Sequence, residues 1–227
     1  EYTGTELRFL HESMRLTKKM DGRVSTQQFF EGNFSVSRSP SHDASYLAGD
    51  FDWRIAWHYN WKPLQNLRML AGVQTGASIG AVYNTRNGNN PAQAKLSADI
   101  AASAMAIYRF TLLKRTFSAR CQLDAPLLGL MFSPAFGQSY YEMFSLGHYD
   151  HNICATWLGN APTFRNLLTL DAPLGAGILR LGWRFDIRQS HVNHLKSHTW
   201  SNVFMIGYVK HFRLVKQKDG EAHKYIL

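Results

Sequence analysis

The residues best suited to nucleophilic chemistry are serines and histidines near the end of the chain. His194, Ser197 and His198 stand close together in the sequence. A histidine base beside a serine hydroxyl is the pair that hydrolases use to form an acyl-enzyme. Ser197 and His198 are adjacent, so on a strand their side chains would point to opposite faces. Catalysis would therefore need a bent loop that brings His194 to Ser197, and these three residues are the catalytic candidates.

Metal and cofactor sites are less well supported by the sequence. Four histidines lie in two predicted loops: His148, His151, His191 and His194. A metal site would require these two loops to converge. The sequence contains no phosphate-binding loop, no glycine-rich nucleotide fingerprint and no recognisable pair of catalytic carboxylates. Cys121 and Cys154 belong to no CxxC motif and are expected to be small apolar side chains. We therefore expect neither a metal nor a cofactor.

A second set of candidates consists of charged residues on one face of segments with alternating polarity. They are Asp52, Arg54, Asp99, Arg120, Asp124, Arg165, Arg180, Arg184, Asp186 and Arg188. Several lie roughly 8–10 residues from a predicted tight turn, which places them in one layer of a tilted sheet. An unpaired ion in a narrow interior costs several kcal/mol. We therefore expect Arg54, Arg165 and Arg184 to contact carboxylates among Asp52, Asp124 and Asp186 and to seal the interior. A polar conduit is the alternative.

The element that would position such charges is clearest between residues 45 and 61. Apolar or aromatic residues such as Trp53 and Trp57 alternate there with polar or small residues such as Asp52 and Arg54. A period of two over this length is typical of a strand. Strands of soluble proteins average about 5–6 residues, whereas a tilted strand that crosses a bilayer needs about 9–11. The aromatic residues at the end of the segment suit a membrane–water interface.

Similar alternation recurs along the chain. It predicts nine strands, at 5–18, 27–38, 45–61, 65–83, 94–112, 116–125, 162–172, 176–189 and 197–214. Segment 94–112 is rich in alanine, so a helix is its alternative. Segment 162–172 is expected to extend back towards Asn152, with an irregularity near Pro162. The outward face and its aromatic girdle are predicted to include Phe51, Trp53, Trp57, Tyr59, Trp61, Tyr83, Tyr108, Phe110, Trp183 and Phe185.

The connections between these strands are of two kinds. Tight turns are predicted at 62–64, 113–115 and 173–175, and longer polar loops at 84–92, 133–151 and 190–196. Transmembrane β-barrels have short periplasmic turns and longer external loops. The chain is thus expected to be an all-β antiparallel transmembrane β-barrel over residues 1–214, followed by a periplasmic tail at 215–227. Bacterial barrels have an even number of strands, so about ten are expected, with one before Glu1. Eight or twelve follow if 5–18 or 134–160 is assigned wrongly.

Composition restricts the class of protein. The chain has 227 residues, a formal net charge of +9 and no run of the roughly 18 apolar residues that a membrane helix needs. A soluble barrel of lipocalin type is the rival fold, because alternation alone does not say which face is inside. The basic balance indicates an anionic neighbour. The basic residues neither cluster on one helix nor interleave with exposed aromatics, so lipopolysaccharide in the outer leaflet is favoured over nucleic acid.

Several segments resemble a known family. They are residues 1–4, 132–134, 137–144, 170–173, 186–189 and 198–201. They are similar to a Bacteroidota family of outer-membrane barrels, most of whose members have no assigned function. The resemblance covers nearly the whole chain. It implies the fold, the compartment and a strand upstream of Glu1, and it brings no activity or catalytic residues.

The sequence therefore predicts a non-catalytic barrel in the outer membrane of a Gram-negative bacterium. Its expected role is that of a structural or accessory subunit of a larger envelope complex. The expected partners are outer-membrane lipids, including lipopolysaccharide, and other outer-membrane proteins. Two alternatives remain open at this stage. One is a lipid-modifying hydrolase at the external rim, of the phospholipase or lipid A deacylase type, and the other is a narrow pore.

Overall fold

The computed structural model describes residues 1–86, 88, 91–134, 137–149, 151–175 and 177–211. Its elements, in chain order, are β1 (Thr3–Leu16), β2 (Val24–Arg38), β3 (Ser45–Leu64), β4 (Leu67–Asn84), β5 (Ala92–Leu112), β6 (Arg115–Phe132), α1 (Tyr140–Phe144), β7 (Ile153–Trp157), β8 (Thr163–Leu174), β9 (Gly177–Val192) and β10 (Leu195–Val209). No helix in these described ranges is long and apolar enough to cross a membrane. The predicted domain boundary at 214, the tail at 215–227 and the last residues of the predicted strand 197–214 lie outside them.

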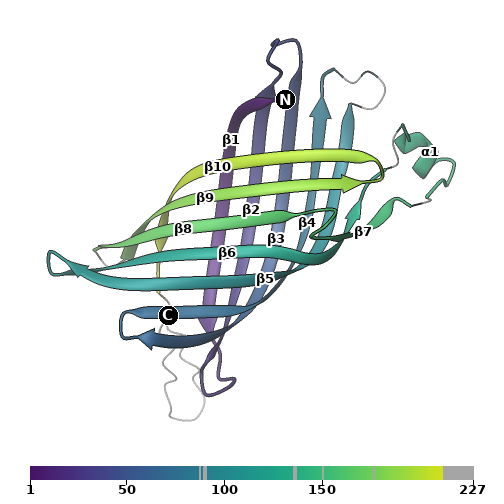
Figure 1. The fold of residues 1–227 in the computed structure, drawn as a ribbon. Coiled ribbons are helices and arrows are strands. Elements are labelled where there is room, and N and C mark those ends of the chain that lie inside the picture. The colour runs from purple at the N-terminus through teal and green to yellow at the C-terminus, as the bar shows by residue number, and fades with distance from the viewer. Residues whose placement is uncertain (87, 89–90, 135–136, 150, 176, 212–227) are drawn as a thin grey trace, which may run out of the picture.

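The strands form one antiparallel sheet that curls into a nearly closed barrel. Its order is β1-β2-β3-β4-β5-β6-β8-β9-β10, and β7 pairs with β6 beside β8. In Figure 1, β1 to β4 pass behind the strands from β6 to β10, and the two sets cross at a steep angle. Leu128 pairs with Trp157 of β7, and Asp124 pairs with Arg165 of β8, so the two short strands occupy one row across the sheet. Ten strands therefore make nine rows, and the break between β7 and β8 falls at the predicted irregularity near Pro162.

All nine predicted segments are strands in the structure, although several of their bounds differ. The largest difference is in β6, which continues to Phe132 rather than ending at 125. The prediction of a long loop at 190–196 is wrong. Leu195 pairs with Val192, which leaves Asn193 and His194 as a two-residue turn with φ of 50° and 63°. Polar residues at 190–196 suggested a loop, but the ladder of β9 and β10 simply continues through them. The loop after β6 holds α1, a helix that alternation could not reveal.

Polar side chains face the inside of the barrel and apolar side chains face outward. On β3, Asp52, Arg54 and His58 are buried, whereas Phe51 is 48 % and Trp53 39 % exposed. Eight of the predicted outward aromatics are among the exposed large apolar residues: Phe51, Trp53, Trp57, Tyr59, Trp61, Tyr83, Tyr108 and Trp183. Phe110 and Phe185 are half-buried between neighbouring rings on the same outer face. This arrangement is the reverse of a soluble barrel, which would bury its aromatic face.

The two edges of the sheet meet at a seam between β1 and β10. No backbone ladder joins these strands within the described residues. With nine antiparallel rows, the first and last run in the same direction. Phe9 on β1 and Phe204 on β10 are 71 % and 84 % exposed, well above Phe51 in the middle of the sheet. On the inner side the seam is bridged, because Arg8 of β1 bonds to Ser201 of β10 at 3.2 Å.

The hairpin turns generate the first prediction. Leu113 and Lys114 join β5 to β6 with φ of 51° and 62°. A left-handed conformation costs an ordinary residue about 1–2 kcal/mol, and turns of this kind prefer Asn-Gly. The double change Leu113→Asn, Lys114→Gly should raise the free energy of unfolding by about 1–2 kcal/mol. Urea titration of the folded protein, followed by tryptophan fluorescence, measures the change.

The turn between β3 and β4 provides the control for this prediction. Gln65 and Asn66 make up that turn, and neither has positive φ. Gln65→Asn, Asn66→Gly should therefore give no gain in stability. An equal gain at both turns would show that backbone strain at Leu113 and Lys114 is not the cause.

Candidate functional site

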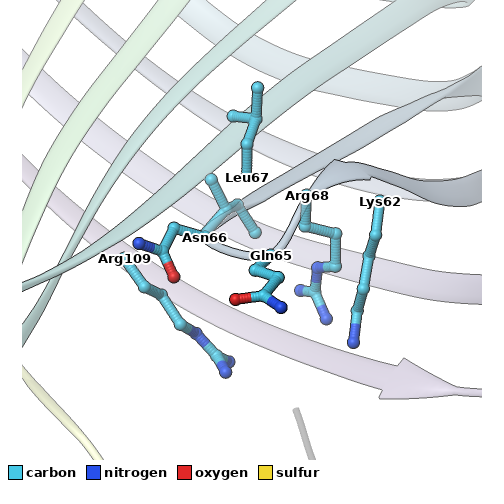
Figure 2. Close-up of a pocket in the computed structure, with 7 residues that line it drawn as sticks. Lys62, Gln65, Asn66, Leu67, Arg68 and Arg109 are labelled. Atoms are coloured by element: carbon cyan, nitrogen blue, oxygen red, sulfur yellow. The ribbon is translucent and has the colours of Figure 1, made fainter.

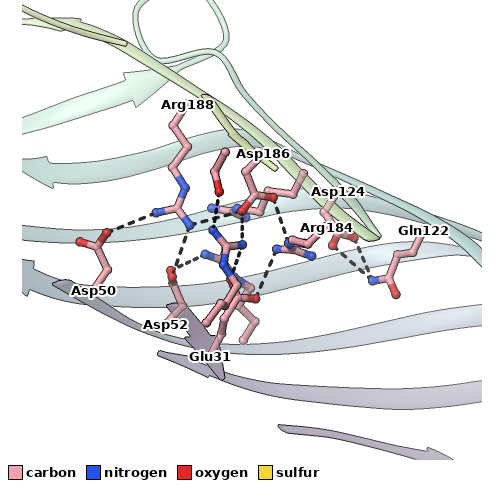
Figure 3. A network of polar contacts seen from close by, with 12 residues as sticks. Glu31, Asp50, Asp52, Gln122, Asp124, Arg184, Asp186 and Arg188 are labelled. Carbon is pink, nitrogen blue, oxygen red and sulfur yellow. Dashed lines mark hydrogen bonds and ion pairs between the residues drawn. The ribbon is translucent and has the colours of Figure 1, made fainter. Parts of the chain in front are cut away.

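The centre of the lumen is a network of ion pairs that links opposite sides of the barrel. Asp186 of β9 accepts a hydrogen bond from Arg8 of β1 at 2.6 Å, and its other oxygen lies 2.9 Å from Nε of Arg184. Arg8 also donates to Glu31 of β2 at 2.9 Å, and Arg184 lies 3.5 Å from the same carboxylate. Figure 3 shows Arg184 between Glu31 and Asp186. Two carboxylates and two guanidiniums from three strands thus neutralise one another.

A second group of pairs lies nearer the loops that follow β2, β4 and β6. Asp52 of β3 forms a short contact with Arg54 and lies 3.5 Å from Arg188 of β9. Arg54 and Arg165 share Asp99 of β5, at 3.8 Å and 3.1 Å. In Figure 3, Arg188 reaches across the lumen towards Asp52. The planar guanidinium can face two carboxylates at once, which suits a link across the barrel.

A third group lies nearer the tight turns. Glu12 of β1 accepts two hydrogen bonds from Arg120 of β6, at 2.5 and 2.9 Å, and one from Arg180 of β9 at 2.7 Å. Gln27 donates to the same carboxylate at 2.6 Å. Arg180 also holds Asp171 of β8 through two bonds, at 2.6 and 2.7 Å. Such paired, charge-assisted bonds are the stronger kind and fix the geometry of both partners.

A histidine, a serine and an aspartate also come together in the lumen. Ser103 donates its hydroxyl proton to Asp124 at 2.5 Å, and its oxygen lies 2.8 Å from Nε2 of His58. Because the single hydroxyl proton goes to Asp124, His58 must donate to Ser103 rather than accept from it. A hydrolase triad has the opposite polarity, with histidine as the base. His58 and Asp124 are 0 % and 2 % exposed, so the arrangement is a polar link inside the plug.

The charged residues of the network are buried inside the barrel. Glu31 is 2 %, Asp52 1 % and Asp186 1 % exposed. Burying these ions is costly, and pairing offsets the cost only where the geometry is good. Not every polar atom is matched: both amide atoms of Gln74 and two nitrogens of Arg165 have no hydrogen-bond partner among the described protein atoms. The plug is therefore held mainly by its ion pairs.

The segment after β6 lies at one end of the barrel and is bonded to the turn between β9 and β10. Asn193, in the turn between β9 and β10, donates to the backbone oxygens of Ser133 and His151 at 2.6 and 2.8 Å. In Figure 1, α1 and β7 lie at this end of the barrel. Ser139 begins α1 with a capping box, in which its N–H and hydroxyl donate to the carboxylate of Glu142 and lower the pKa of that group. We call this segment, with its short helix, the cap.

The predicted lumen residues all face the interior, with one difference in pairing. Arg54 contacts Asp52, and Arg184 contacts Asp186. Arg165 contacts Asp99 instead of Asp52, Asp124 or Asp186. Asp124 is held by Ser103 and Gln122. Sequence reasoning missed six members of the network: Glu6, Arg8, Glu12, Glu31, Asp50 and Asp171.

A signal for some of these missed residues was present in the sequence. Glu6, Arg8 and Glu12 stand at every second or fourth position of β1, which puts all three on one face. The alternation of apolar residues in this segment is poor, so it did not show that this face is the inner one.

The predicted catalytic candidates are not assembled into a site. His194 lies in the turn after β9, whereas Ser197 and His198 follow on β10 and pair with Ser190 and Gln189. Adjacent residues of a strand face opposite sides of the sheet, so the hydroxyl and the imidazole diverge. All three are exposed. Among the described residues no cluster of histidine, cysteine or acidic side chains could hold a metal, and both cysteines are free.

Comparison with known proteins identifies a family and no individual relative. A family model described as "Protein of unknown function (DUF3316)" matches residues 1–219. No curated protein and no solved structure matches the chain. The predicted resemblance to a family without an assigned function is thus confirmed as membership of that family.

The network generates the second prediction. Asp186→Asn keeps the shape of the side chain but leaves Arg8, Arg184 and Arg188 facing a neutral amide. Breaking a buried pair in this way costs about 3–5 kcal/mol of the free energy of unfolding, measurable by urea titration. The matched control is Asp43→Asn, in the exposed loop after β2, where no measurable loss is expected. Equal losses at both positions would show that burial of the network does not matter.

Proposed function

The chain belongs to the DUF3316 family, and we propose that it forms a β-barrel in the outer membrane of a Gram-negative bacterium of the Bacteroidota. Its role in this proposal is non-catalytic, as a structural or accessory subunit of a larger envelope complex. One observation carries the proposal: charged side chains fill the inside of the barrel, while aromatic and aliphatic side chains cover the outside.

The outer face is suited to lipid rather than to water. Leucine, isoleucine, valine and aromatic side chains are exposed on strand after strand, over far more area than isolated surface residues of a soluble protein. β3 has 20 residues and β5 has 21, and about 9–11 residues suffice for a tilted strand to cross a bilayer. A lipid environment would satisfy this face, and the hydrogen-bond ladders leave backbone groups unpaired mainly along the edges of β1 and β10.

The connections support an orientation. One end of the barrel has the turns at 65–66 and 113–114, the connection from β8 to β9 and the connection at 17–23 between β1 and β2, and we call it the turn end. The other has the loop at 39–44, the connection from β4 to β5, the cap after β6 and the two-residue turn at 193–194, and we call it the loop end. Short turns are periplasmic in known outer-membrane barrels, so the proposal places the cap outside the cell.

The seam supports a tenth row in the completed barrel. β1 and β10 run in the same direction, so one strand antiparallel to both would pair with each edge. Such a strand would bring the rows to ten, the even number usual in bacterial barrels. The proposal fills this place with one further strand.

Ion pairs fill the interior of the barrel. This favours a function of its outer surfaces over a function of the lumen. Seven arginines are held by carboxylates inside the barrel: Arg8, Arg54, Arg120, Arg165, Arg180, Arg184 and Arg188. Their charge is therefore not available to an external polyanion such as nucleic acid. What the barrel offers to partners is its outer wall and its cap. Outer-membrane lipids, including lipopolysaccharide, and other outer-membrane proteins are the partners that such surfaces fit.

The third prediction tests the lipid face. Trp53→Arg and Phe185→Arg each put a charge where the proposal places hydrocarbon, at a cost of about 2–4 kcal/mol near the bilayer midplane. Both should lower the amount of heat-modifiable, folded barrel in the detergent-extracted membrane fraction. Trp53→Phe and Phe185→Leu are the matched controls and should assemble normally. Normal assembly of both arginine variants would contradict the membrane location.

The fourth prediction tests the role. Membranes that hold the native protein are solubilised in a mild maltoside detergent and resolved on a native gel. The protein should migrate well above a single 25.9 kDa chain in its micelle and should shift to the monomer position in harsh detergent. A monomer under both conditions would contradict the subunit role.

The two alternatives give their own signals with the purified protein. Discrete openings in a planar bilayer would favour the pore. Release of fatty acid from phospholipid, abolished by Ser197→Ala and by His194→Ala, would favour the hydrolase. Neither signal is expected if the lumen is plugged and the candidate residues diverge.

A further inference from the structure

A cavity of about 310 Å³ opens at the turn end of the barrel, beside the turn between β3 and β4. Its walls are formed by Lys62, Gln65, Asn66, Leu67, Arg68, Ile107 and Arg109. Figure 2 shows the polar ends of Lys62, Arg68 and Arg109 directed to the same side of the ribbon as those of Gln65 and Asn66, while Leu67 points away. Three cations and two side-chain amides therefore converge on one space.

These cations differ from the arginines of the plug in having no counter-charge. The walls of the cavity include no carboxylate. In the described part of the chain, no ion pair involves Lys62, Arg68 or Arg109. Arg68 is half-buried, and the charge of Arg109 acts against it. Cations that repel one another at a partly desolvated site are stabilised when an anion enters.

The surroundings of the cavity add to its positive potential. Basic residues near the same mouth include Arg15, Lys19, Arg23, Lys114 and Arg115. Acidic residues near the turns in the described chain are Asp21 and Asp171, and Asp171 is already held by Arg180. A mouth with an excess of positive charge attracts and concentrates anionic ligands.

We propose that this cavity binds the phosphate group of an anionic ligand. Guanidinium forks match the oxygens of a phosphate, an ammonium adds a point charge, and amide N–H groups add further donors. The volume is at the lower end of the range for small-molecule pockets, so it admits a diphosphate or a phosphorylated headgroup. This site goes beyond the proposed function and does not depend on it, because the cavity exists in either orientation of the barrel.

The test uses the purified full chain in maltoside detergent, titrated with inorganic pyrophosphate at about physiological salt in a calorimeter. Wild type should show saturable binding of one ligand per chain. Arg68→Gln and Arg109→Gln should each weaken binding by about tenfold or more, since each removes a charge-assisted contact. Arg115→Gln and Lys114→Gln remove charge from the same end but outside the cavity, and each should change the affinity less than about twofold. Heat-modifiable migration on a gel checks that every variant is folded. If Arg109→Gln does not fold, Arg109→Lys is used in its place.

A second arm separates free phosphate from a lipid headgroup. The protein is placed in nanodiscs of phosphatidylglycerol or phosphatidylcholine, and the lipid retained after detergent exchange is quantified. If wild type does not bind pyrophosphate and Arg109→Gln retains less phosphatidylglycerol than wild type, the site is assigned to a lipid headgroup. If wild type binds pyrophosphate and the retained phosphatidylglycerol does not fall in Arg109→Gln, the site is assigned to a soluble ligand. No binding in either arm, or equal losses in Arg109→Gln and Arg115→Gln, would overturn the proposal.

Discussion

The structure depends on the pairing of charges that the sheet encloses. Asp186 contacts guanidiniums from β1 and β9, and Glu12 contacts guanidiniums from β6 and β9. A single buried ion left alone costs several kcal/mol, so these carboxylates require the opposite walls of the barrel to stay in register. In an ordinary domain this role belongs to apolar packing. Here the apolar side chains face outward, and the ion pairs set the position of one wall against the other.

The same pairing explains how a sheet with an open seam holds its shape. No backbone ladder joins β1 to β10 among the described residues, yet Arg8 of β1 reaches Asp186 and Ser201, and Glu6 accepts a hydrogen bond from Ser201. These contacts lie on the inner side of the seam and hold its edges near each other. No such contact is described on the outer side, where apolar side chains such as Leu7 and Phe204 are 78 % and 84 % exposed. A strand that completed the ladder would cover them.

Much of this fold follows from alternation, because a period of two assigns both the strand and its faces. β3 and β9 show it over most of their length, and the face on which their charges lie was predicted correctly. β1 shows it poorly, so Arg8 and Glu12 were missed although they lie at the centre of the network. Pairing across the lumen could not be predicted, since it depends on tilt and register. Arg165 therefore contacts Asp99 rather than the three carboxylates expected for it.

The network also determines where the basic excess of the chain can act. Most of the acidic residues lie in the lumen, whereas most of the lysines and arginines lie outside it. The net charge of +9 therefore understates how basic the outside of the barrel is. This excess is not spread evenly, because the turn end holds Lys62, Arg68 and Arg109 without described counter-charges, whereas Arg86 at the loop end lies 3.9 Å from Asp43. In the proposed orientation the turn end faces the periplasm, so the charge that composition alone would assign to lipopolysaccharide is directed instead at periplasmic anions.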